Sequence, residues 1–386
     1  MSPPLRILHI YKDYFPVLGG IENHIKVLAE AQAMRGHAVT VLVANPGRRT
    51  VIETANGVRV VKAGRWATFA STPISPATFR WVARIEADIA HLHFPYPPGE
   101  IAHLWLGRAK RFVVNYHSDI VRQRLLGALY RPFVWRVLQR ADRLIAGSPA
   151  YVESSPYLSR FRDKCTVVPY GTDLERFDQV DPARTANVRH RLIPQADHCP
   201  ILLFVGRLRY YKGINDLLHA LTKIPGAHLL IVGDGPMREP WEQLTRELDL
   251  FARVTFAGEV DDADLPACYR LADVFVLPSN LRAEAFGKVL LEAMASGLPV
   301  ISTELGSGTS WVNLHGTTGL IVPPRDPAAL AQALNTLLSD PAKRAEMGRA
   351  AYQRAHTEFS QTAMIERMEQ VYCDVCGNSL FAARPQ

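Results

Sequence analysis

Short apolar runs alternate with segments of helical periodicity along almost the whole chain, and this alternation constrains the fold more than any other feature. Each run has the nearly unbroken apolar character of a strand that is buried on both faces. Because helical segments separate most of the runs, the pattern predicts an α/β protein with parallel, doubly wound sheets. The runs expected as strands are residues 5–11, 38–44, 58–63, 88–94, 111–117, 143–148, 165–171, 201–208, 227–236, 254–260, 272–279 and 299–303.

The strands fall into two series with a polar segment between them. Residues 172–199 contain Pro182 and Pro194 and hold few strand signals. At 386 residues the chain is also too long for one compact core. We therefore expect two domains, with residues 172–199 as the interdomain linker.

Composition excludes several classes of protein. Hydrophobic residues make up 48% and charged residues 21% of the chain, which is typical of a soluble globular protein. No apolar run approaches the roughly 18 residues of a membrane span, and the N-terminus lacks the pattern of a signal peptide. The five cysteines are scattered and odd in number, so a reducing, cytoplasmic location is expected. Cys373 and Cys376 form one CxxC pair without further ligands at zinc spacing, so no zinc site is expected there.

The stretch from Pro278 to Val300 holds two carboxylates, Glu284 and Glu292, eight residues apart. A strand ends before Glu284, and a helix opens at Phe286-Gly287. Unpaired backbone N–H groups at a helix start favour an anion. We therefore predict an anion-binding site in front of this helix, with Glu284 at its mouth.

Two cations follow the strand expected at residues 201–208. Arg207 and Lys212 flank the loop before the next helix. Arginine can grip phosphate oxygens with two N–H groups, and lysine acts as a point charge. This pair therefore suits a pyrophosphate, whereas two solvated loop charges are the alternative.

In the first series, Gly19 and Gly20 lie between a strand and a helix. The backbone there can approach a ligand closely, although a plain tight turn is the alternative.

His117 follows a strand at the carboxyl edge of the sheet, where ligands of open α/β sheets collect, and a packing histidine is the alternative. His91 and His93 share one strand face, but nothing in the sequence supplies further metal ligands, so a structural or substrate-lining role is favoured.

These motifs resemble those of the retaining nucleotide-sugar glycosyltransferases of family 4, also called group 1. The resemblance rests on the Gly-Gly pair, His117, the GRL, four residues, KG pattern around Arg207 and Lys212, and the glutamate pair. It implies the GT-B fold, in which two Rossmann-like domains face each other across a cleft and a C-terminal helix crosses back to the first domain. The implied segments are an acceptor domain at 1–178 with a helix near 357–372, a donor domain at 190–356, and a tail at 373–386.

The resemblance also implies a role for each site residue. His117 and Glu284 orient the donor sugar, Glu292 binds the nucleotide ribose, and Arg207 with Lys212 stabilises the departing diphosphate. Because those cations neutralise the leaving group, neither a metal nor a cofactor is expected, and Asp262 and Asp264 are interpreted as helix caps. The remaining donor-binding residues implied are Gly19, Gly20, Ala285, Phe286, Gly287 and Lys288.

The segment after the glutamates, residues 302–324, resembles mannosyltransferases that use GDP-mannose in the assembly of surface polysaccharides. The expected reaction is therefore transfer of mannose to a hydroxyl of a glycan or lipid-linked acceptor. The alternatives are a glycosyltransferase that uses UDP-glucose, UDP-galactose or UDP-N-acetylglucosamine, and a nucleotide-sugar epimerase of the same fold.

The formal net charge of +7 includes an excess of arginine between Arg108 and Lys164. No nucleic-acid-binding motif accompanies this charge, so nucleic acid is not an expected partner. Residues 121–143 mix arginines, among them Arg122 and Arg140, with Leu, Tyr, Phe and Trp, and Pro132 interrupts the run. Two interpretations stand: a core helix with snorkelling arginines, or peripheral contact with the inner face of an anionic membrane.

Overall fold

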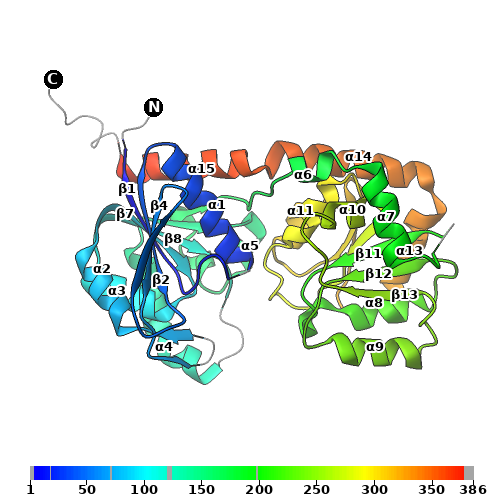
Figure 1. The fold of residues 1–386 in the computed structure, drawn as a ribbon, viewed down its shortest axis with the longest axis horizontal. Helices are drawn as coiled ribbons and strands as arrows, with labels where there is room; N and C mark the ends of the chain where they lie inside the picture. The colour runs from blue at the N-terminus through cyan, green and yellow to red at the C-terminus, as the bar shows by residue number, and fades with distance from the viewer. Residues whose placement is uncertain (1–3, 18, 70–71, 120–123, 197–198, 378–386) are drawn as a thin grey trace. The chain divides into compact units, whose positions relative to one another are not determined.

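The computed structural model describes residues 4–17, 19–69, 72–119, 124–196 and 199–377, with side chains except those of residues 124–129. The chain divides into two compact units (Figure 1). The first unit comprises residues 1–171 and 362–386, and the second comprises residues 172–361. Each unit is an α/β domain built on its own sheet.

The first unit contains a sheet in the order β10-β9-β8-β7-β1-β2-β4-β3. All neighbours in it are parallel except β3 and β4, which are antiparallel. A separate two-stranded sheet pairs β5 with β6. The strands are β1 (Arg6–Ile10), β2 (Ala38–Ala44), β3 (Val51–Ala55), β4 (Val58–Ala63), β5 (Ala67–Phe69), β6 (Thr72–Ile74), β7 (Glu86–Phe94), β8 (Arg108–Tyr116), β9 (Arg143–Ala146) and β10 (Cys165–Val167). The helices are α1 (Gly20–Met34), α2 (Pro76–Arg84), α3 (Pro97–Leu106), α4 (Arg124–Arg140), α5 (Pro149–Ser154) and α15 (Gln361–Cys376), with short 3-10 turns η1 (Leu158–Arg160) and η2 (Arg162–Lys164).

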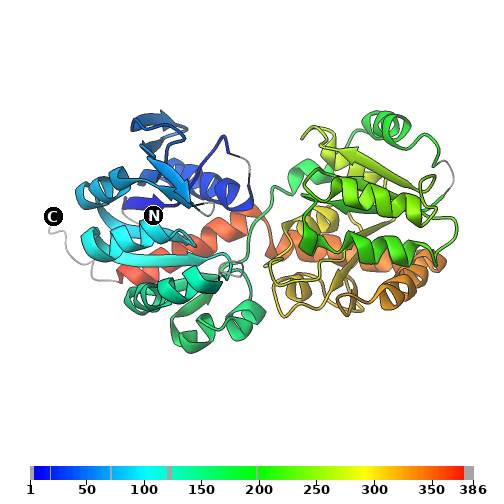
Figure 2. The ribbon, with the colours of Figure 1, turned by 90° about the horizontal axis from the view of Figure 1, so that it is seen from below.

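Both faces of the first unit's sheet carry core residues, and successive residues of a strand point to opposite sides. Leu8 and Ile10 of β1 join the core on one face, and Ile7 joins the core on the other. On the second face α15 supplies Met364, Met368 and Tyr372. This helix, red in Figure 1 and Figure 2, therefore completes the core of the first unit from the far end of the chain.

The second unit contains a sheet in the order β13-β12-β11-β14-β15-β16, and all of its strands are parallel. The expected doubly wound α/β architecture is confirmed for both units. The strands are β11 (Ile201–Val205), β12 (His228–Val232), β13 (Val254–Gly258), β14 (Val274–Leu277), β15 (Val300–Thr303) and β16 (Gly319–Val322). The helices are α6 (Glu175–Asp178), α7 (Pro182–Leu192), α8 (Ile214–Leu221), α9 (Arg238–Glu247), α10 (Leu265–Arg270), α11 (Lys288–Ala295), α12 (Thr309–Val312), α13 (Pro327–Ser339) and α14 (Pro341–Glu358), with the 3-10 turn η3 (Tyr210–Lys212).

Residues 172–199, expected as a linker, instead contain α6 and α7 and belong to the second unit. Asp181 caps α7 by accepting a hydrogen bond from Ala183 N, and Pro182 occupies its first turn. Val188 is the only buried residue of this helix, so its sequence gave no clear apolar periodicity, and ion pairs also hold the helix in place. Arg184 and Arg191 bind Asp264, which precedes α10, at 3.4 and 2.6 Å.

Other differences lie at the edges of the sheets and at the C-terminal end. β3 and β16 were not expected, and β3 is exposed along its whole length, so no buried face marked it as a strand. The tail expected from residue 373 starts later, because α15 continues to Cys376, which is buried. Residues 378–386 lie outside the described part of the chain. None of the described helices is long and apolar enough to cross a membrane.

We expect the docking of α15 to contribute measurably to the stability of the first unit. Met368 is fully buried in the second-face core, so Met368→Ala should lower the free energy of unfolding by about 2–5 kcal/mol through lost contacts and a residual cavity. Met368→Leu keeps the volume and should cost less than about 1.5 kcal/mol. Urea unfolding followed by circular dichroism measures both, with Glu366→Ala on the exposed side of the same helix as control. Equal midpoints for Met368→Ala and Glu366→Ala would contradict this account of α15.

Candidate functional site

In the second unit, the loops after β11 and β14 meet at the carboxyl edge of the sheet. Lys212 Nζ lies 2.5 Å from Glu284 Oε2, and both residues are buried. Gly213, which follows Lys212, has a positive φ of 68°. A side chain at that position would overlap the carbonyl oxygen of Pro278. The glycine therefore allows the close approach of the two loops that brings Lys212 to Glu284.

The ion pair is sheltered from water, which decides the charge of its lysine. Burial alone would lower the pKa of Lys212, but the Glu284 carboxylate and the Tyr211 hydroxyl hold that pKa above its ordinary value. Lys212 therefore remains an ammonium group with three N–H donors, only one of which is needed for Glu284. The other donors are available for anionic oxygens.

Glu284 is fixed by hydrogen bonds to its side chain and its backbone. Ser279 Oγ donates to Glu284 Oε2 at 3.0 Å, and Ser307 Oγ donates to the Glu284 carbonyl oxygen at 2.8 Å. Gly308 N donates to the carbonyl oxygen of Ala285 at 2.7 Å. The segment after β15 thus holds the loop of the first glutamate in one position.

The helix after Glu284 begins at Lys288, two residues later than expected. Gly287 is its N-cap residue with a φ of 78°, and Phe286 is buried beneath the loop. A left-handed residue at this point turns the backbone sharply into the helix. The first-turn N–H groups of α11 still follow the carboxyl end of β14, as an anion site requires.

Glu292, about one turn into α11, has different partners from Glu284. Tyr269 Oη donates a hydrogen bond to Glu292 Oε2 at 2.7 Å. Burial raises the pKa of Glu292 above its ordinary value, although the Tyr269 hydroxyl and the charges of Arg176 and Lys288 oppose that shift. The two glutamates therefore occupy separate environments.

The other cation predicted for the site behaves differently from Lys212. Arg207 is exposed in the turn after β11, and within the described residues it forms no ion pair. Its neighbour Gly206 lies at the strand end, where an added Cβ would sit 3.5 Å from Lys212 Nζ. The structure therefore brings Lys212 and Glu284 into direct contact, and Arg207 follows the same strand end without joining them.

Gly19 and Gly20 belong to the first unit, at the start of α1. Gly19 is the N-cap residue in an extended conformation, so it is not there for a left-handed backbone. A side chain at Gly19 would overlap the carboxylate of Glu22, whose pKa is raised by burial. In the structure, the Glu22 carboxylate thus occupies the space next to Gly19.

His117 is buried directly after β8, and both of its ring nitrogens have partners. Nε2 lies 3.0 Å from His93 Nδ1, and Nδ1 is hydrogen-bonded to the hydroxyl of Tyr170. His9, Gln32 and Tyr170 extend this cluster, and sequence reasoning missed all three. The available signal was the strand alternation in residues 5–11, which puts His9 two positions after Ile7 on the same face.

His9 lies beside His91 and His93, and one ring nitrogen of each histidine is within 4.8 Å of the others. The expectation that His91 and His93 have no further potential ligand nearby was therefore wrong. Their geometry nevertheless fits a metal poorly. A metal lies close to the plane of each imidazole that binds it, about 2.0–2.1 Å from the nitrogen. The rings of His91 and His93 are instead stacked, with centroids 4.4 Å apart and planes 23° apart. Two lone pairs in stacked planes do not converge on one ion.

Asp262 and Asp264 do not cap α10 with their side chains, contrary to expectation. Asp264 is the N-cap residue but makes no side-chain cap hydrogen bond. Its carboxylate is used by Arg184 and Arg191 instead, and Arg176 donates to the carbonyl oxygen of Asp262. Asp264 therefore links α7 to the start of α10, and Asp262 is joined to α6 through Arg176.

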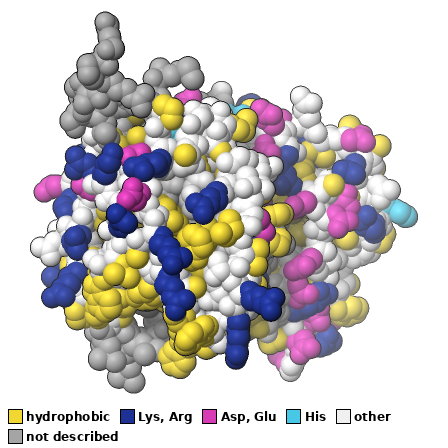
Figure 3. All heavy atoms as spheres, turned by 60° about the vertical axis from the view of Figure 1, so that its left-hand side comes forward, with side chains coloured by type: hydrophobic (Ala, Val, Ile, Leu, Met, Phe, Trp, Pro, Cys, Tyr) yellow, Lys and Arg dark blue, Asp and Glu magenta, His cyan; other side chains and the backbone are white. Residues whose placement is uncertain are grey.

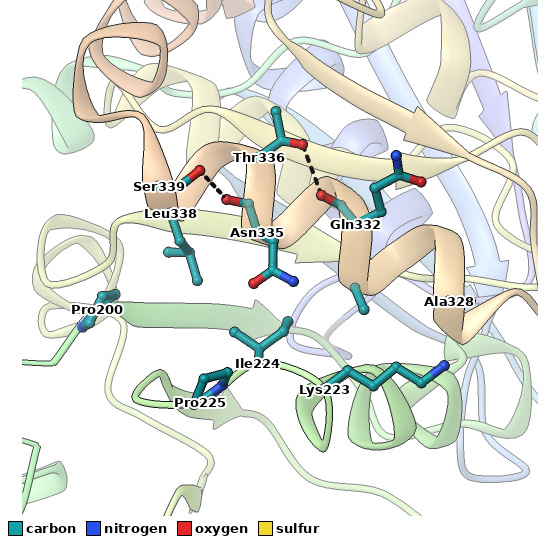
Figure 4. Close-up of a pocket in the computed structure, with 11 residues that line it drawn as sticks. Pro200, Lys223, Ile224, Pro225, Ala328, Gln332, Asn335, Thr336, Leu338 and Ser339 are labelled. Carbon is teal, nitrogen blue, oxygen red and sulfur yellow. Dashed lines mark hydrogen bonds between the residues drawn. The ribbon is translucent and has the colours of Figure 1, made fainter.

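A groove in the second unit lies away from these residues (Figure 4). It is lined by Pro200, Ile224 and one side of α13, and Pro200 precedes the amino end of β11. The hydroxyls of Thr336 and Ser339 donate to carbonyl oxygens of their own helix. Since ligands of parallel sheets bind at the carboxyl ends of strands, we do not assign the site to this groove.

Comparisons with known proteins agree with this geometry. Residues 18–176 match the model of Glycosyltransferase Family 4, and residues 191–354 match that of Glycosyl transferases group 1. The chain is 40% identical to the D-rhamnosyltransferase WbpZ of Pseudomonas aeruginosa, over 92% of each chain. It is 36% identical to the O-antigen chain mannosyltransferase C of Escherichia coli, over 95% of this chain and 98% of that protein.

A solved structure gives the same result for the fold. The sucrose-phosphate synthase of Thermosynechococcus elongatus superposes with a TM-score of 0.80 at 29% identity, covering 98% of this chain and 100% of that one. Both halves of the chain thus match the same family, and each half has the sheet that the family requires. The chain therefore belongs to the group 1, family 4 glycosyltransferases and is a hexosyltransferase of the GT-B fold.

Proposed function

We propose that the protein transfers mannose from GDP-mannose to a hydroxyl of a glycan or lipid-linked acceptor, with retention of the anomeric configuration and without a metal. The observation that supports a nucleotide-sugar site most directly is the buried Lys212–Glu284 pair at the carboxyl edge of the second unit's sheet. A buried ammonium group beside a helix start suits a diphosphate. A buried carboxylate next to it suits the hydroxyls of the attached sugar.

The roles proposed for the two cations follow from their burial. Lys212 donates one N–H to Glu284 and the others to oxygens of the diphosphate, and it stabilises the negative charge that develops there as the glycosidic bond breaks. Arg207, which is exposed, adds a second contact from the strand end. Because protein cations and the N–H groups of α11 neutralise this charge, we propose that no metal is needed.

The donor sugar is inferred from the names of the relatives. One is a D-rhamnosyltransferase and another is a mannosyltransferase. D-rhamnose is 6-deoxy-D-mannose, so the two sugars share the configuration of every ring carbon and differ only at C6. This favours a sugar of mannose configuration over glucose, galactose or N-acetylglucosamine.

A donor screen tests the proposal. We expect calorimetry to detect GDP-mannose and GDP-D-rhamnose, with UDP-glucose, UDP-galactose and UDP-N-acetylglucosamine at least about 1.4 kcal/mol weaker, which is tenfold in Kd. Turnover of the preferred donor should be the same in EDTA, and NMR of the product should show the anomeric configuration of the donor. Preference for a UDP-sugar would overturn the donor assignment. Loss of turnover in EDTA that Mg²⁺ restores would overturn the account of the leaving group.

Substitution of Glu284 and substitution of Glu292 should have different effects on ligand binding and on kcat. Glu292→Gln removes a charge-assisted contact to the ribose and should weaken binding of the nucleoside diphosphate by about 1.5–3 kcal/mol. Glu284→Gln removes a contact to the sugar and frees Lys212 from its counter-charge. We therefore expect nucleoside diphosphate binding to be kept or tightened, while kcat falls by about 10².

Titration of both variants with nucleoside diphosphate and with intact donor measures this difference. Glu239→Gln, an exposed carboxylate on α9, serves as the control and should behave like the unaltered protein. If Glu284→Gln weakens nucleoside diphosphate binding as much as Glu292→Gln does, the proposed division of roles is wrong.

We also propose peripheral contact with an anionic membrane through α3 and α4. Arg131 and Arg136 are exposed on α4, and Pro132 lies within that helix without ending it. On α3, Trp105 is 65% exposed and its ring lies 6.4 Å from that of Phe133. Figure 3 shows this side of the first unit, where hydrophobic side chains gather beside Lys and Arg. Exposed aromatics next to arginines suit a lipid surface. Arg122 lies outside the described residues.

Co-sedimentation with vesicles that contain phosphatidylglycerol tests this contact. Arg136→Glu should weaken binding by about 2 kcal/mol, because it removes one attraction of about 1 kcal/mol and adds a repulsion of similar size. Arg246→Glu, the same change at an exposed position of α9, is the control. Equal effects of the two changes, or binding that salt does not weaken, would argue against this surface.

A further inference from the structure

One face of the first unit's sheet changes from apolar to histidine-lined towards its carboxyl edge. Ile7 of β1 is paired with Ile89 of β7, and two residues further along His9 is paired with His91. Ile7, Ile89 and Val113 lie in the core under α15. In the same strand alternation His9, His93 and His117 follow on this face, on β1, on β7 and just after β8. The fold therefore aligns imidazoles from three neighbouring strands.

These imidazoles form one continuous chain of hydrogen bonds. His9 Nε2 lies 2.8 Å from Gln32 Oε1 on α1, and His9 Nδ1 lies 3.0 Å from His93 Nε2. His93 Nδ1 lies 3.0 Å from His117 Nε2, and His117 Nδ1 bonds the Tyr170 hydroxyl. The centroids of His9 and His93, and of His93 and His117, are 5.3 Å apart in both pairs. With nitrogens 3.0 Å apart, the rings meet edge to edge.

Such a chain has a direction. A neutral imidazole has one N–H donor and one bare acceptor nitrogen, and an amide oxygen only accepts. Because Gln32 Oε1 faces His9, the proton of His9 is on Nε2 and its Nδ1 accepts from His93. The same argument puts the proton of His93 and then that of His117 on Nε2. Tyr170 finally donates its hydroxyl proton to His117 Nδ1.

Burial keeps the linking imidazoles neutral, which the direction requires. Burial lowers the pKa of His9 to about 4, although the hydrogen bond to Gln32 opposes the shift. Burial, with the neighbouring histidines, holds the pKa of His93 well below its ordinary value. A protonated ring within the chain would present two N–H groups and break its direction.

We propose that Gln32, His9 and His93 are positioning residues for the glycosyltransfer reaction, which fix the tautomer of His117 and the hydroxyl direction of Tyr170 through this one-directional chain. The proposal rests on the proposed function only in assigning His117 to the site of transfer. Neither Gln32 nor His9 needs to touch a substrate. Their effect is transmitted because each link accepts on one side and donates on the other.

The consequence for a ligand concerns Tyr170, which is only partly buried at the end of the chain. Its proton is committed to His117, so its oxygen meets any further group as an acceptor. A hydroxyl of a sugar or an acceptor would then donate to Tyr170. If the chain ran the other way, Tyr170 would instead accept from His117 and present its own proton outwards.

A purely structural role would not require this arrangement. The same sheet face is filled by isoleucine and valine one step deeper in the core, and buried polar groups cost free energy unless they are all satisfied. Within the described part of the chain, Gln32 Nε2 is buried without a hydrogen-bond partner, while Oε1 faces His9. The accepting end of the amide is thus turned towards the chain, and the amide also opposes the rise that burial causes in the pKa of Tyr372.

Nitrogen NMR of the full chain with ¹⁵N-labelled histidine tests the direction without any substrate. We expect His9, His93 and His117 all to be Nε2–H tautomers, assigned by comparison with His→Gln variants. Gln32→Met removes the accepting oxygen at similar volume and should give mixed tautomers at His9 and His93. His91→Leu is the matched control, because His91 is equally buried and stacks on His93 but is outside the chain. It should leave the tautomers unchanged.

Steady-state kinetics with the preferred donor test the effect on the reaction. Gln32→Met should lower kcat by about tenfold or more while KM for the donor stays within about twofold, as expected when orientation and not binding is lost. His93→Leu should do the same. His93→Gln should recover most of the loss, because its amide can donate to His9 and accept from His117. His91→Leu should retain the kcat of the unaltered protein.

Two kinds of result would overturn the proposal, one for each of its parts. Nδ1–H tautomers at His9 and His93 in the unaltered protein, or unchanged tautomers in Gln32→Met, would refute the chain direction. Altered tautomers with an unaltered kcat, or equal loss in His93→Leu and His91→Leu, would refute the positioning role. A protein inactive with every nucleotide sugar would refute the proposed function, while the NMR result would still decide the direction of the chain.

Discussion

Parallel strand pairing is the constraint on which the rest of this structure depends. A parallel sheet brings the carboxyl ends of its strands to one edge, and its helical crossovers cover both faces. The apolar runs can therefore be buried completely, and the loops after them are the part left for chemistry. In the second unit this edge collects Lys212, Glu284 and the start of α11. In the first unit it collects His117 and the end of the histidine chain.

Buried polar groups are satisfied in different ways at the carboxyl edges of the two sheets. On the second unit's sheet, opposite charges pair directly, and the carboxylate keeps the pKa of Lys212 raised despite burial. On the first unit's sheet, neutral imidazoles hydrogen-bond to one another in sequence, and burial keeps His9 and His93 uncharged. The first arrangement suits a ligand that brings negative charge. The second suits a ligand that brings hydroxyl groups, which is the division expected between a diphosphate and a sugar or an acceptor.

Much of the fold followed from local patterns, and the exceptions have physical reasons. β2 and β4 were predicted at their observed bounds because buried strands are continuous apolar runs. α7 was missed because Val188 is its only buried residue, so no apolar periodicity marked it. β3 was missed because it is exposed, although Asn56-Gly57, with positive φ at both residues, is a strong hairpin signal between β3 and β4. Recognition of that turn would have predicted the antiparallel edge.

The sequence by itself determined the α/β alternation, the family, and which residue types stand at the strand ends, since these depend on neighbours along the chain. Only the tertiary structure decided which of those residues meet. Lys212 and Glu284 touch because Gly213 lets two loops approach, and His9 and His93 line up with His117 because strand register aligns them. Gln32 of α1 and Tyr170, which follows β10, reach this row through the packing of the unit. Register and loop contact are set by packing over the whole sheet, so no local pattern encodes them.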